Sequence, residues 1–454
     1  MAVIVSSPKP LSVSPLKASA PLGGALAFMG MEGSLPLFHG AQGCTAFALV
    51  SMVRHFREAI PLQTTAMNEI TTILGGMDNI EEALLAITRR AKPSIIGLLS
   101  TALTETRGED VESDLRAILA RNLELSGVAV VYASAPDYAG SLETGWSRAV
   151  EAMLRELPKP AETRTRLKRI NILPGVHLTP GDVEALRDIV ADFGLDAVIL
   201  PDLSAALDGH VPGHYVPTTL GGTTVAEARS MGRSLATIAV GEHMRPAAEL
   251  LAERTGVPAV VFDRLSGLEP VDRLMVTLSS LAERPVPPRY RRQRSQLVDA
   301  MLDGQFVFSG RRLAMAGEPD LLVTLGNVAA EMGAEVTAAV SATASPHLDQ
   351  FPAGRVVVGD LDDLEAEIEA TGGCDLVIAN SNARQLAERL GVPLCRAGFP
   401  INDRLGAPHW TTLGYRGTRD LIFTLGSQLM EAASHQFSDS GGGHSHDHPP
   451  FTAC

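Results

Sequence analysis

One cysteine of this chain lies in a sequence pattern that suits metal or thiol chemistry. The segment from His39 to Cys44 reads HGAQGC, and an apolar, helix-like run from Thr45 to His55 follows it. This pattern places Cys44 at the first turn of a helix, where unpaired N–H groups and the positive end of the helix dipole face the sulfur. Such surroundings stabilise a thiolate, which binds iron or zinc or attacks an electrophile. The two glycines let the backbone approach a bulky group closely.

Cys44 also fits a simpler role as a small buried hydrophobe, because free cysteine is among the most buried residue types. Of the other cysteines, Cys374 lies in a turn before a strand and Cys395 lies inside a strand, so both are expected in the core. An iron–sulfur cluster usually takes about four ligands. If Cys44 is one of them, the others must come from a second polypeptide, and the cluster must lie at a subunit interface.

Length and composition narrow the class of protein. The 454 residues predict two or three α/β domains, and 45% hydrophobic with only 4% aromatic residues favours helices packed on parallel sheets. The net charge of −14 argues against a general nucleic-acid binder, which needs a basic face. Four cysteines do not make a disulfide framework in a chain of this length. The N-terminus does not read as a signal peptide and no apolar run approaches ~20 residues, so we expect a cytoplasmic protein without a membrane span.

Several familiar motifs are missing from the sequence. There is no Gly-x-Gly-x-x-Gly between a strand and a helix, no P-loop motif and no Gly-x-Ser-x-Gly motif. The sequence also has no Cys-x-x-Cys pair, which excludes a zinc ribbon or a self-contained ferredoxin-type site.

Strand and helix patterns alternate along the chain and predict mostly parallel, doubly wound, Rossmann-like sheets with right-handed crossovers. Proline-rich breaks near 158–162 and 285–288 separate the expected units. The expected parts are an extended N-terminal arm (1–22), three α/β domains (23–160, 161–288 and 289–437) and a disordered His-rich tail (438–454). Strands are expected near 94–101, 128–132, 170–173, 197–200, 235–240, 259–262, 313–316, 336–340, 356–358 and 376–379, and around Cys395. Ligands bind at the carboxyl ends of such strands, so 100–105, 134–138 and 202–204 are candidate cleft walls.

Three further groups of residues have weaker claims to a function. Asp202, Asp208 and His210 have metal-ligand side chains, but capping of turns explains them as well. The arginines within 289–294 suit an anion, although a solvated helix start fits them better. His444, His446, His448 and Cys454 of the tail have side chains that bind stray metal ions, whereas a solvated tail without a dedicated role is the simpler interpretation.

From about residue 16 to residue 430, the chain resembles the nitrogenase component 1 superfamily. Within it, the chain resembles the β-type subunits of the scaffold that assembles the iron–molybdenum cofactor. The matching segments are HGAQGC (39–44), MNEITTILGGMDN (67–79), STALTETRGED (100–110), VVYASAPDYAG (130–140), HLTPGD (177–182), LPDLSAALDGH (200–210), RSQLVDAMLDGQF (294–306), GFPINDRLGAP (398–408) and GYRGTR (414–419).

The resemblance implies a fold of the component 1 type and a particular set of cluster ligands. The catalytic β subunit of nitrogenase resembles this chain around Ser19 and Ala102, but it has cysteine at both positions. It supplies three thiolates to the eight-iron P-cluster, whereas this chain keeps only Cys44. The resemblance therefore implies a smaller [4Fe–4S] cluster, with Cys44 as one ligand and three ligands from the partner subunit, NifE.

The resemblance also implies partners and the residues around the cluster. The subunits form an α2β2 heterotetramer, which receives a cofactor precursor from NifB. The precursor is held mainly by the α-type subunit and matures with molybdenum and homocitrate, helped by the transient nitrogenase iron protein. Gly40 and Gly43 are expected to let the backbone approach the cluster, and His39 and Asp137 to lie beside it, although packing at the helix entry explains His39 equally well. No catalytic residue is expected in this chain.

Two other functions remain open at this point. One is an oxidoreductase, namely a catalytic β subunit of a nitrogenase or of a light-independent protochlorophyllide reductase. The replacements at Ser19 and Ala102 speak against the nitrogenase version. The other is an unrelated enzyme of Rossmann-like domains that uses a sugar nucleotide.

Overall fold

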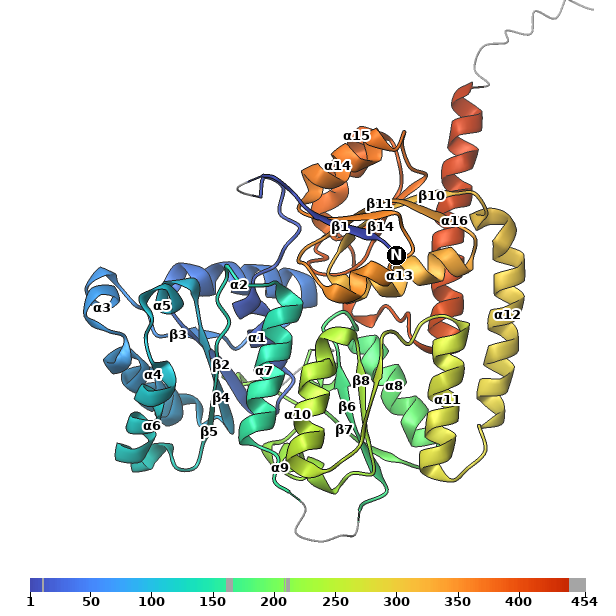
Figure 1. Cartoon of the computed structure of the whole chain (residues 1–454). Coiled ribbons are helices and arrows are strands. Elements are labelled where there is room, and N and C mark those ends of the chain that lie inside the picture. Colours follow the sequence, from blue (N-terminus) through green and yellow to red (C-terminus); the bar gives the residue numbers. More distant parts are fainter. Residues whose placement is uncertain (10–11, 161–165, 208, 210–212, 441–454) are drawn as a thin grey trace, which may run out of the picture.

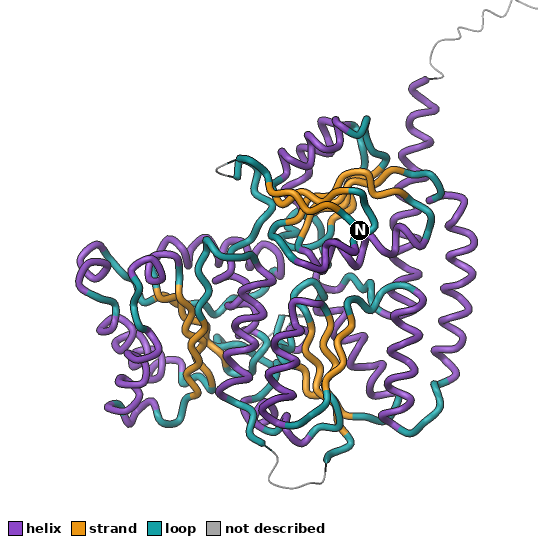
Figure 2. Tube along the Cα trace, in the orientation of Figure 1, coloured by secondary structure: helices purple, strands orange, loops and turns teal. Residues whose placement is uncertain are grey.

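The computed structural model describes residues 1–9, 12–160, 166–207, 209 and 213–440, and the side chains of 434–440 are not described. Three separate sheets organise these residues, and Figure 2 shows them as three groups of strands, each with helices beside it. All strand pairs of the sheets are parallel, as the alternation of strands and helices predicts. No helix in the described part of the chain is long and apolar enough to cross a membrane.

The first sheet has the order β3-β2-β4-β5. Its strands are β2 (Ser34–His39), β3 (Gln63–Thr64), β4 (Ile95–Ser100) and β5 (Ala129–Ala133). Its helices are α1 (Ala20–Met29), α2 (Gln42–Phe56), α3 (Glu69–Leu74), α4 (Met77–Ala91), α5 (Ala102–Arg107), α6 (Val111–Arg121) and α7 (Leu142–Glu156), with the short 3-10 helix η1 (Leu123–Leu125). Side chains of α4 and α6 form one apolar core with β2 and β4, while α1, α2 and α7 share a second core.

The second sheet has the order β7-β6-β8-β9. Its strands are β6 (Arg169–Pro174), β7 (Asp196–Ile199), β8 (Thr237–Val240) and β9 (Ala259–Phe262). The helices that follow them are α8 (Pro180–Asp192), η2 (Leu203–Ala205), α9 (Val225–Arg229), η3 (Met231–Arg233), η4 (Glu242–Met244), α10 (Arg245–Thr255) and α11 (Leu268–Ala282).

The third sheet has six strands in the order β1-β12-β11-β10-β13-β14. They are β1 (Val3–Ser6), β10 (Arg312–Gly317), β11 (Glu335–Ser341), β12 (Arg355–Val358), β13 (Leu376–Ala379) and β14 (Leu394–Arg396). The helices of this part are α12 (Pro288–Phe308), α13 (Pro319–Glu331), η5 (Pro346–Gln350), α14 (Leu361–Ala370), η6 (Ser381–Ala383), α15 (Arg384–Leu390), η7 (Ala407–His409) and α16 (Gly414–Ser440). The long helices α12 and α16 pack side by side (Figure 1).

The N-terminal residues take part in the third sheet rather than the first. Val3–Ser6 pairs in parallel with Arg355–Val358, so the start of the chain lies beside a strand that follows it by about 350 residues in sequence. The chain then crosses to the first sheet, where α1 begins at Ala20. The expected boundaries of the arm, the three domains and the tail stay predictions, and residues 441–454 of that tail lie outside the described part.

Three strands, namely β1, β2 and β3, lie where the sequence pattern predicted none. β2 is buried along its whole length but contains Pro36, and proline argues against a central strand because it lacks an N–H donor. The structure accommodates it because β3 pairs only with Leu37 and Phe38, which leaves that edge of β2 without a strand at Pro36. β3 has two residues, too few to give a periodic pattern.

The three sheets share continuous cores. One core cluster includes side chains of the first and second sheets, and another includes side chains of the second and third. The core shared by the first and second sheets depends on the close packing of α1 against α7 (Figure 1). A Cβ at Gly145 would lie 1.7 Å from the carbonyl oxygen of Ala20, and a Cβ at Gly23 would lie 2.0 Å from that of Leu142. Glycine at these two positions is therefore a condition of this helix contact.

We predict that Gly145→Ala destabilises the protein by about 1–3 kcal/mol, because the added methyl group forces the two backbones apart. Helix propensity alone predicts the opposite sign, since alanine is favoured over glycine inside a helix by about 1 kcal/mol. Thermal and urea unfolding of the purified chain measure the effect. Gly127→Ala is the matched control, because a Cβ there meets no described atom within 4 Å. An unfolding midpoint of Gly145→Ala at or above that of the unmodified chain contradicts this account of the packing.

Candidate metal centre at the start of helix α2

Cys44 lies in the first turn of α2, as the sequence predicts. β2 ends at His39, and Ala41 is the residue before the helix, with an extended backbone and no capping side chain among the described residues. The thiol is exposed rather than sealed in the core. It faces an open pocket whose wall includes Lys17, Ser19, Arg54 and Asp137. The first helical N–H groups are therefore free to face a ligand bound beside the sulfur.

The two glycines before Cys44 serve different purposes. A Cβ at Gly40 would lie 2.6 Å from the hydroxyl oxygen of Thr101, so this glycine permits close contact with the start of α5. A Cβ at Gly43 would meet no described atom within 4 Å. The space beside Gly43 is thus open toward the outside of the chain, as the approach of a bulky group requires.

His39 is held by hydrogen bonds within its own domain. Its side chain is fully buried, with Nδ1 at 3.0 Å from Thr65 Oγ1 and Nε2 at 2.8 Å from Glu109 Oε2. Burial lowers the pKa of His39, and the interaction with Glu109 opposes this shift. The hydroxyl of Thr101 donates to the carbonyl of His39 at 2.9 Å, which joins the end of β2 to the start of α5. In this arrangement His39 fixes the turn that presents Cys44, and its place beside a cofactor stays a prediction.

Asp137 connects the positions that the resemblance singled out. Its Oδ2 accepts the backbone N–H of Ala102 at 3.4 Å, and its carboxylate is hydrogen-bonded to the side chain of Ser19. Burial raises the pKa of Asp137, and these hydrogen bonds together with the charge of Lys17 oppose that shift. Its own charge in turn acts on Cys44. Ser19, Cys44 and Ala102, which are far apart in sequence, therefore surround one carboxylate.

The structure corrects one expectation about the thiol. The pattern at the helix start predicts a stabilised thiolate, whereas the pKa of Cys44 is raised by partial burial and by the negative charge of Asp137. In the chain alone, these two effects outweigh the hydrogen bonding at the start of α2. A bound metal ion reverses the balance, because coordination to a metal deprotonates a thiol.

Of the other cysteines, Cys395 lies in the core as the sequence predicts, whereas Cys374 is only half-buried. Cys395 is buried in β14, and burial raises its pKa to about 12. Cys374 is half-buried before β13, and burial raises its pKa to about 11. Neither lines the pocket beside Cys44. Cys44 is thus the one exposed thiol of the described residues.

Some of the weaker candidates form structural contacts, and the others lie outside the described residues. Asp202 is buried and forms an ion pair with Arg187 and a 2.7 Å hydrogen bond from Ser204, which explains it as a structural residue. Arg289 and Arg294 lie at the start of α12 and pair with Asp192 and Asp272. Asp208, His210 and the tail residues His444, His446, His448 and Cys454 lie outside the described part of the chain.

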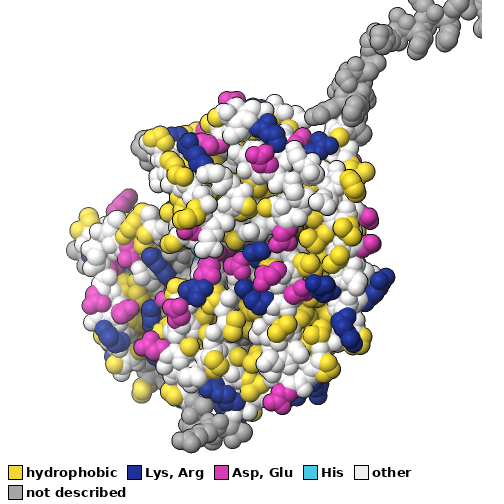
Figure 3. Space-filling view, turned by 45° about the vertical axis from the view of Figure 1, so that its right-hand side comes forward, with side chains coloured by type: hydrophobic (Ala, Val, Ile, Leu, Met, Phe, Trp, Pro, Cys, Tyr) yellow, Lys and Arg dark blue, Asp and Glu magenta, His cyan; other side chains and the backbone are white. Residues whose placement is uncertain are grey.

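An exposed apolar face lies next to Cys44. On α2, Phe47 is 81% exposed, and Val50 and Val53 are also exposed, although the opposite side of the helix is buried. On the face shown in Figure 3, acidic, basic and hydrophobic side chains are interspersed. Apolar side chains gathered at one place on a surface mark a site of protein association.

One group of ionisable side chains was not predicted from the sequence. Glu143, His177, His243 and Asp320 come together from three parts of the chain, with ligand atoms all within 4.8 Å of one another. Spacing along the chain gives no sign of this group, since its members lie up to 177 residues apart. The sequence offers two signals of this group. The surroundings of its residues are buried, and the residues come just after strands.

Comparison with known proteins identifies the family. Residues 19–430 match the family described as nitrogenase component 1 type oxidoreductase. The chain is 50% identical to the nitrogenase iron-molybdenum cofactor biosynthesis protein NifN of Bradyrhizobium diazoefficiens, over 95% of this chain and 92% of the relative. It is 51% identical to NifN of Mesorhizobium japonicum, with 96% and 94% covered, and 48% identical to NifN of Nostoc, with 95% and 96% covered.

Solved structures agree with these relatives. The fold matches a chain of the structure titled "Nitrogenase Cp1 at pH 6.5" with a TM-score of 0.89 and 27% identity, over 97% of this chain and 98% of that chain. A second nitrogenase chain, titled "Nitrogenase Cp1 at pH 5", matches with a TM-score of 0.71 at 12% identity and shows the fold alone. The chain therefore belongs to the nitrogenase component 1 family and, within it, to the NifN proteins.

Proposed function

We propose that this chain is the β-type subunit of a scaffold on which the iron–molybdenum cofactor of nitrogenase is assembled. The names of relatives about 50% identical over nearly the whole chain support this function. We further propose that the chain pairs with NifE in a cytoplasmic α2β2 heterotetramer and shares a [4Fe–4S] cluster with it. The observation that carries the proposal is the thiol of Cys44, the one exposed thiol among the described residues, at the mouth of an open pocket.

The donor set at the pocket fits one corner of a four-iron cluster. Cys44 offers a thiolate once bound to metal, the space at Gly43 is open, and the first N–H groups of α2 are available to the sulfides. Ser19 and Ala102 stand around the same carboxylate but offer a hydroxyl and a methyl group. Neither group replaces the bridging thiolates that an eight-iron cluster takes from a catalytic β subunit.

The partner must then supply the three remaining ligands, and the surface beside Cys44 suits that role. The exposed apolar side chains of α2 gain from being covered, and a cluster shared at this place lies at the edge of the buried contact. When bound, the cluster passes electrons toward the precursor. This chain's own contribution is to hold one iron, position the cluster through the turn at His39, and complete the interface.

The remaining steps of the proposal follow from the resemblance. The precursor comes from NifB and is held mainly by the α-type subunit, where it takes up molybdenum and homocitrate. The nitrogenase iron protein binds transiently during this maturation. Under this proposal the chain is a scaffold, and none of its residues carries a catalytic step.

We predict that Cys44→Ala, in the complex with NifE, loses the shared cluster while the fold survives. The expected loss is about four iron atoms per pair of subunits, because one missing ligand opens the cluster to solvent. Iron analysis and electron paramagnetic resonance of the purified complex measure it. Cys374→Ala is the matched control and retains the iron. A Cys44→Ala complex with unchanged iron content and unchanged spectra rejects the proposal.

We also predict that Phe47→Glu weakens pairing with NifE at least tenfold, since it places a charge in the apolar face beside Cys44. Analytical ultracentrifugation of the mixed subunits measures the affinity. Leu123→Glu is the control, because Leu123 is 86% exposed on η1, which packs with α4 and α6 away from α2. Equal affinities of the two variants would place the interface elsewhere.

A further inference from the structure

The ends of strands from all three sheets meet at one buried group of side chains. Glu143 lies in the first turn of α7 after β5, His177 follows β6, His243 follows β8, and Asp320 lies in the first turn of α13 after β10. His347, in η5 after β11, adjoins them, with Nε2 at 2.6 Å from Asp320 Oδ1. Carboxyl ends of parallel strands are where α/β proteins bind ligands.

We propose that Glu143, His177, His243 and Asp320 bind a divalent first-row metal ion with the tetrahedral geometry of zinc, at the junction of the three sheets. Two imidazoles and two carboxylates are a donor set that such ions accept. The site is separate from the cluster at Cys44, and it does not depend on the function proposed above.

The distances between the four side chains suit a metal ion. The ligand atoms of the four residues all lie within 4.8 Å of one another. Around a tetrahedral zinc ion with bonds of about 2.1 Å, neighbouring ligand atoms are about 3.4 Å apart. A closure of little more than 1 Å between the ligand atoms therefore brings the donors to bonding distance.

The imidazole ring of His177 is the second feature that favours a metal ion. Both ring nitrogens of His177 are buried and have no hydrogen-bond partner within the described part of the chain. A neutral imidazole carries a lone pair on one ring nitrogen, and at His177 that lone pair has no partner among the described residues. A buried polar atom without a partner is unfavourable, and a metal ion gives this lone pair a partner.

The backbone around the four side chains leaves room for them to meet. A Cβ at Gly241 would lie 2.5 Å from Asp320 Oδ2 and 2.9 Å from Cε1 of His177. A Cβ at Gly175 would lie 2.6 Å from Cε1 of His243 and 2.7 Å from Nδ1 of His177. Gly241 also has a φ of +99°, which side chains other than glycine rarely adopt. Both glycines therefore line the space in which the rings and the carboxylate meet.

The negative charges of the two carboxylates in the group also favour a cation. Glu143 and Asp320 are both buried, and Glu143 Oε1 accepts the backbone N–H of Asp320 at 2.9 Å. Two carboxylates in one buried place repel each other, and a divalent cation between them neutralises both.

His243 is already oriented toward the group. Its Nδ1 pairs with Asp320 and lies 4.0 Å from Glu143 Oε2, while its Nε2 accepts the N–H of Val176 at 3.3 Å. Without metal, Nδ1 therefore carries the proton. Metal binding at Nδ1 moves that proton to Nε2 and gives up the long bond from Val176.

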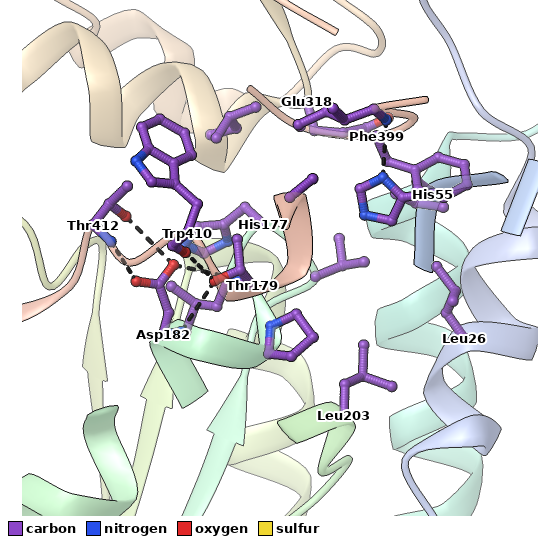
Figure 4. Close-up of a pocket in the computed structure, with 18 of the residues that line it drawn as sticks. Leu26, His55, His177, Thr179, Asp182, Leu203, Glu318, Phe399, Trp410 and Thr412 are labelled. Atoms are coloured by element: carbon purple, nitrogen blue, oxygen red, sulfur yellow. Dashed lines mark hydrogen bonds between the residues drawn. The ribbon is translucent and has the colours of Figure 1, made fainter. Parts of the chain in front are cut away.

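An entry path is also present. His177 borders a mostly apolar pocket, shown in Figure 4, whose walls include Leu26, His55, Glu318 and Phe399. On another side of the pocket, Asp182 accepts the N–H of Thr412 at 2.6 Å, and Thr179 donates to the carbonyl of Trp410 at 2.6 Å. His177 is thus the member of the group that borders this pocket, and the pocket is the route by which a small ion reaches the donors under this proposal.

Titration of the full chain with Zn²⁺ and Co²⁺ tests the proposal. The parent for the test carries alanine in place of His444, His446 and His448, together with Cys44→Ala and Cys454→Ser, so that these side chains do not compete for metal. We expect one equivalent of Zn²⁺ to bind and to raise the thermal midpoint. We also expect Co²⁺ to give the intense visible absorption of a tetrahedral site without sulfur-to-metal charge transfer.

His177→Phe removes the donor while filling its space, and we expect it to weaken Zn²⁺ binding at least 100-fold and abolish the thermal shift. Asp320→Asn is the second variant, and it should act the same way if His177→Phe fails to fold. His214→Phe is the control, because His214 is exposed outside the group. Absence of stoichiometric Zn²⁺ binding to the parent, or equal binding by folded His177→Phe and His214→Phe, overturns the proposal and leaves the group as a hydrogen-bonded junction of the three sheets.

Discussion

All strands within each sheet of this chain run in the same direction, and this constraint decides where its chemistry can lie. Parallel strands present their carboxyl ends at one edge, while helices cover both faces with apolar side chains. His39 ends β2, Thr101 follows β4 and Asp137 lies in the turn after β5. The edge of the first sheet therefore gathers the residues around Cys44, and the edges of all three sheets gather Glu143, His177, His243 and Asp320.

Helix packing holds these edges in place. The contact of α1 with α7, made possible by Gly23 and Gly145, sets the position of Ser19 just before α1 and of Glu143 in the first turn of α7. The contact thus fixes one residue beside Cys44 and one residue of the group at the junction of the sheets. The cores continue from the first sheet to the second and from the second to the third, so each sheet restrains its neighbours.

Local patterns in the sequence predicted a large part of the fold. The strand around Leu376–Ala379 was predicted with its observed bounds, and most others within one or two residues, because short apolar runs bounded by turns mark buried strands. β2 was missed because Pro36 interrupts its pattern, and β1 because four residues at the start of the chain carry little signal. The sheet to which β1 belongs is a property of the tertiary fold that no local pattern encodes.

The site was predictable in part, for similar physical reasons. The glycines and the apolar run after Cys44 placed that residue at the first turn of a helix, and the structure has it there, exposed rather than buried in the core. The direction of its pKa shift was wrong, because it depends on Asp137, which is about ninety residues away in sequence. The group at the junction of the sheets was not predicted, since its side chains meet only through the packing of three sheets.

Anomalous scattering at the iron edge from crystals of the complex with NifE tests the central claim most directly. The account predicts four iron atoms at the subunit interface, one bonded to Cys44 Sγ and the other three bonded to the partner. An eight-iron cluster at this place, or iron density with no bond to Cys44, would contradict it.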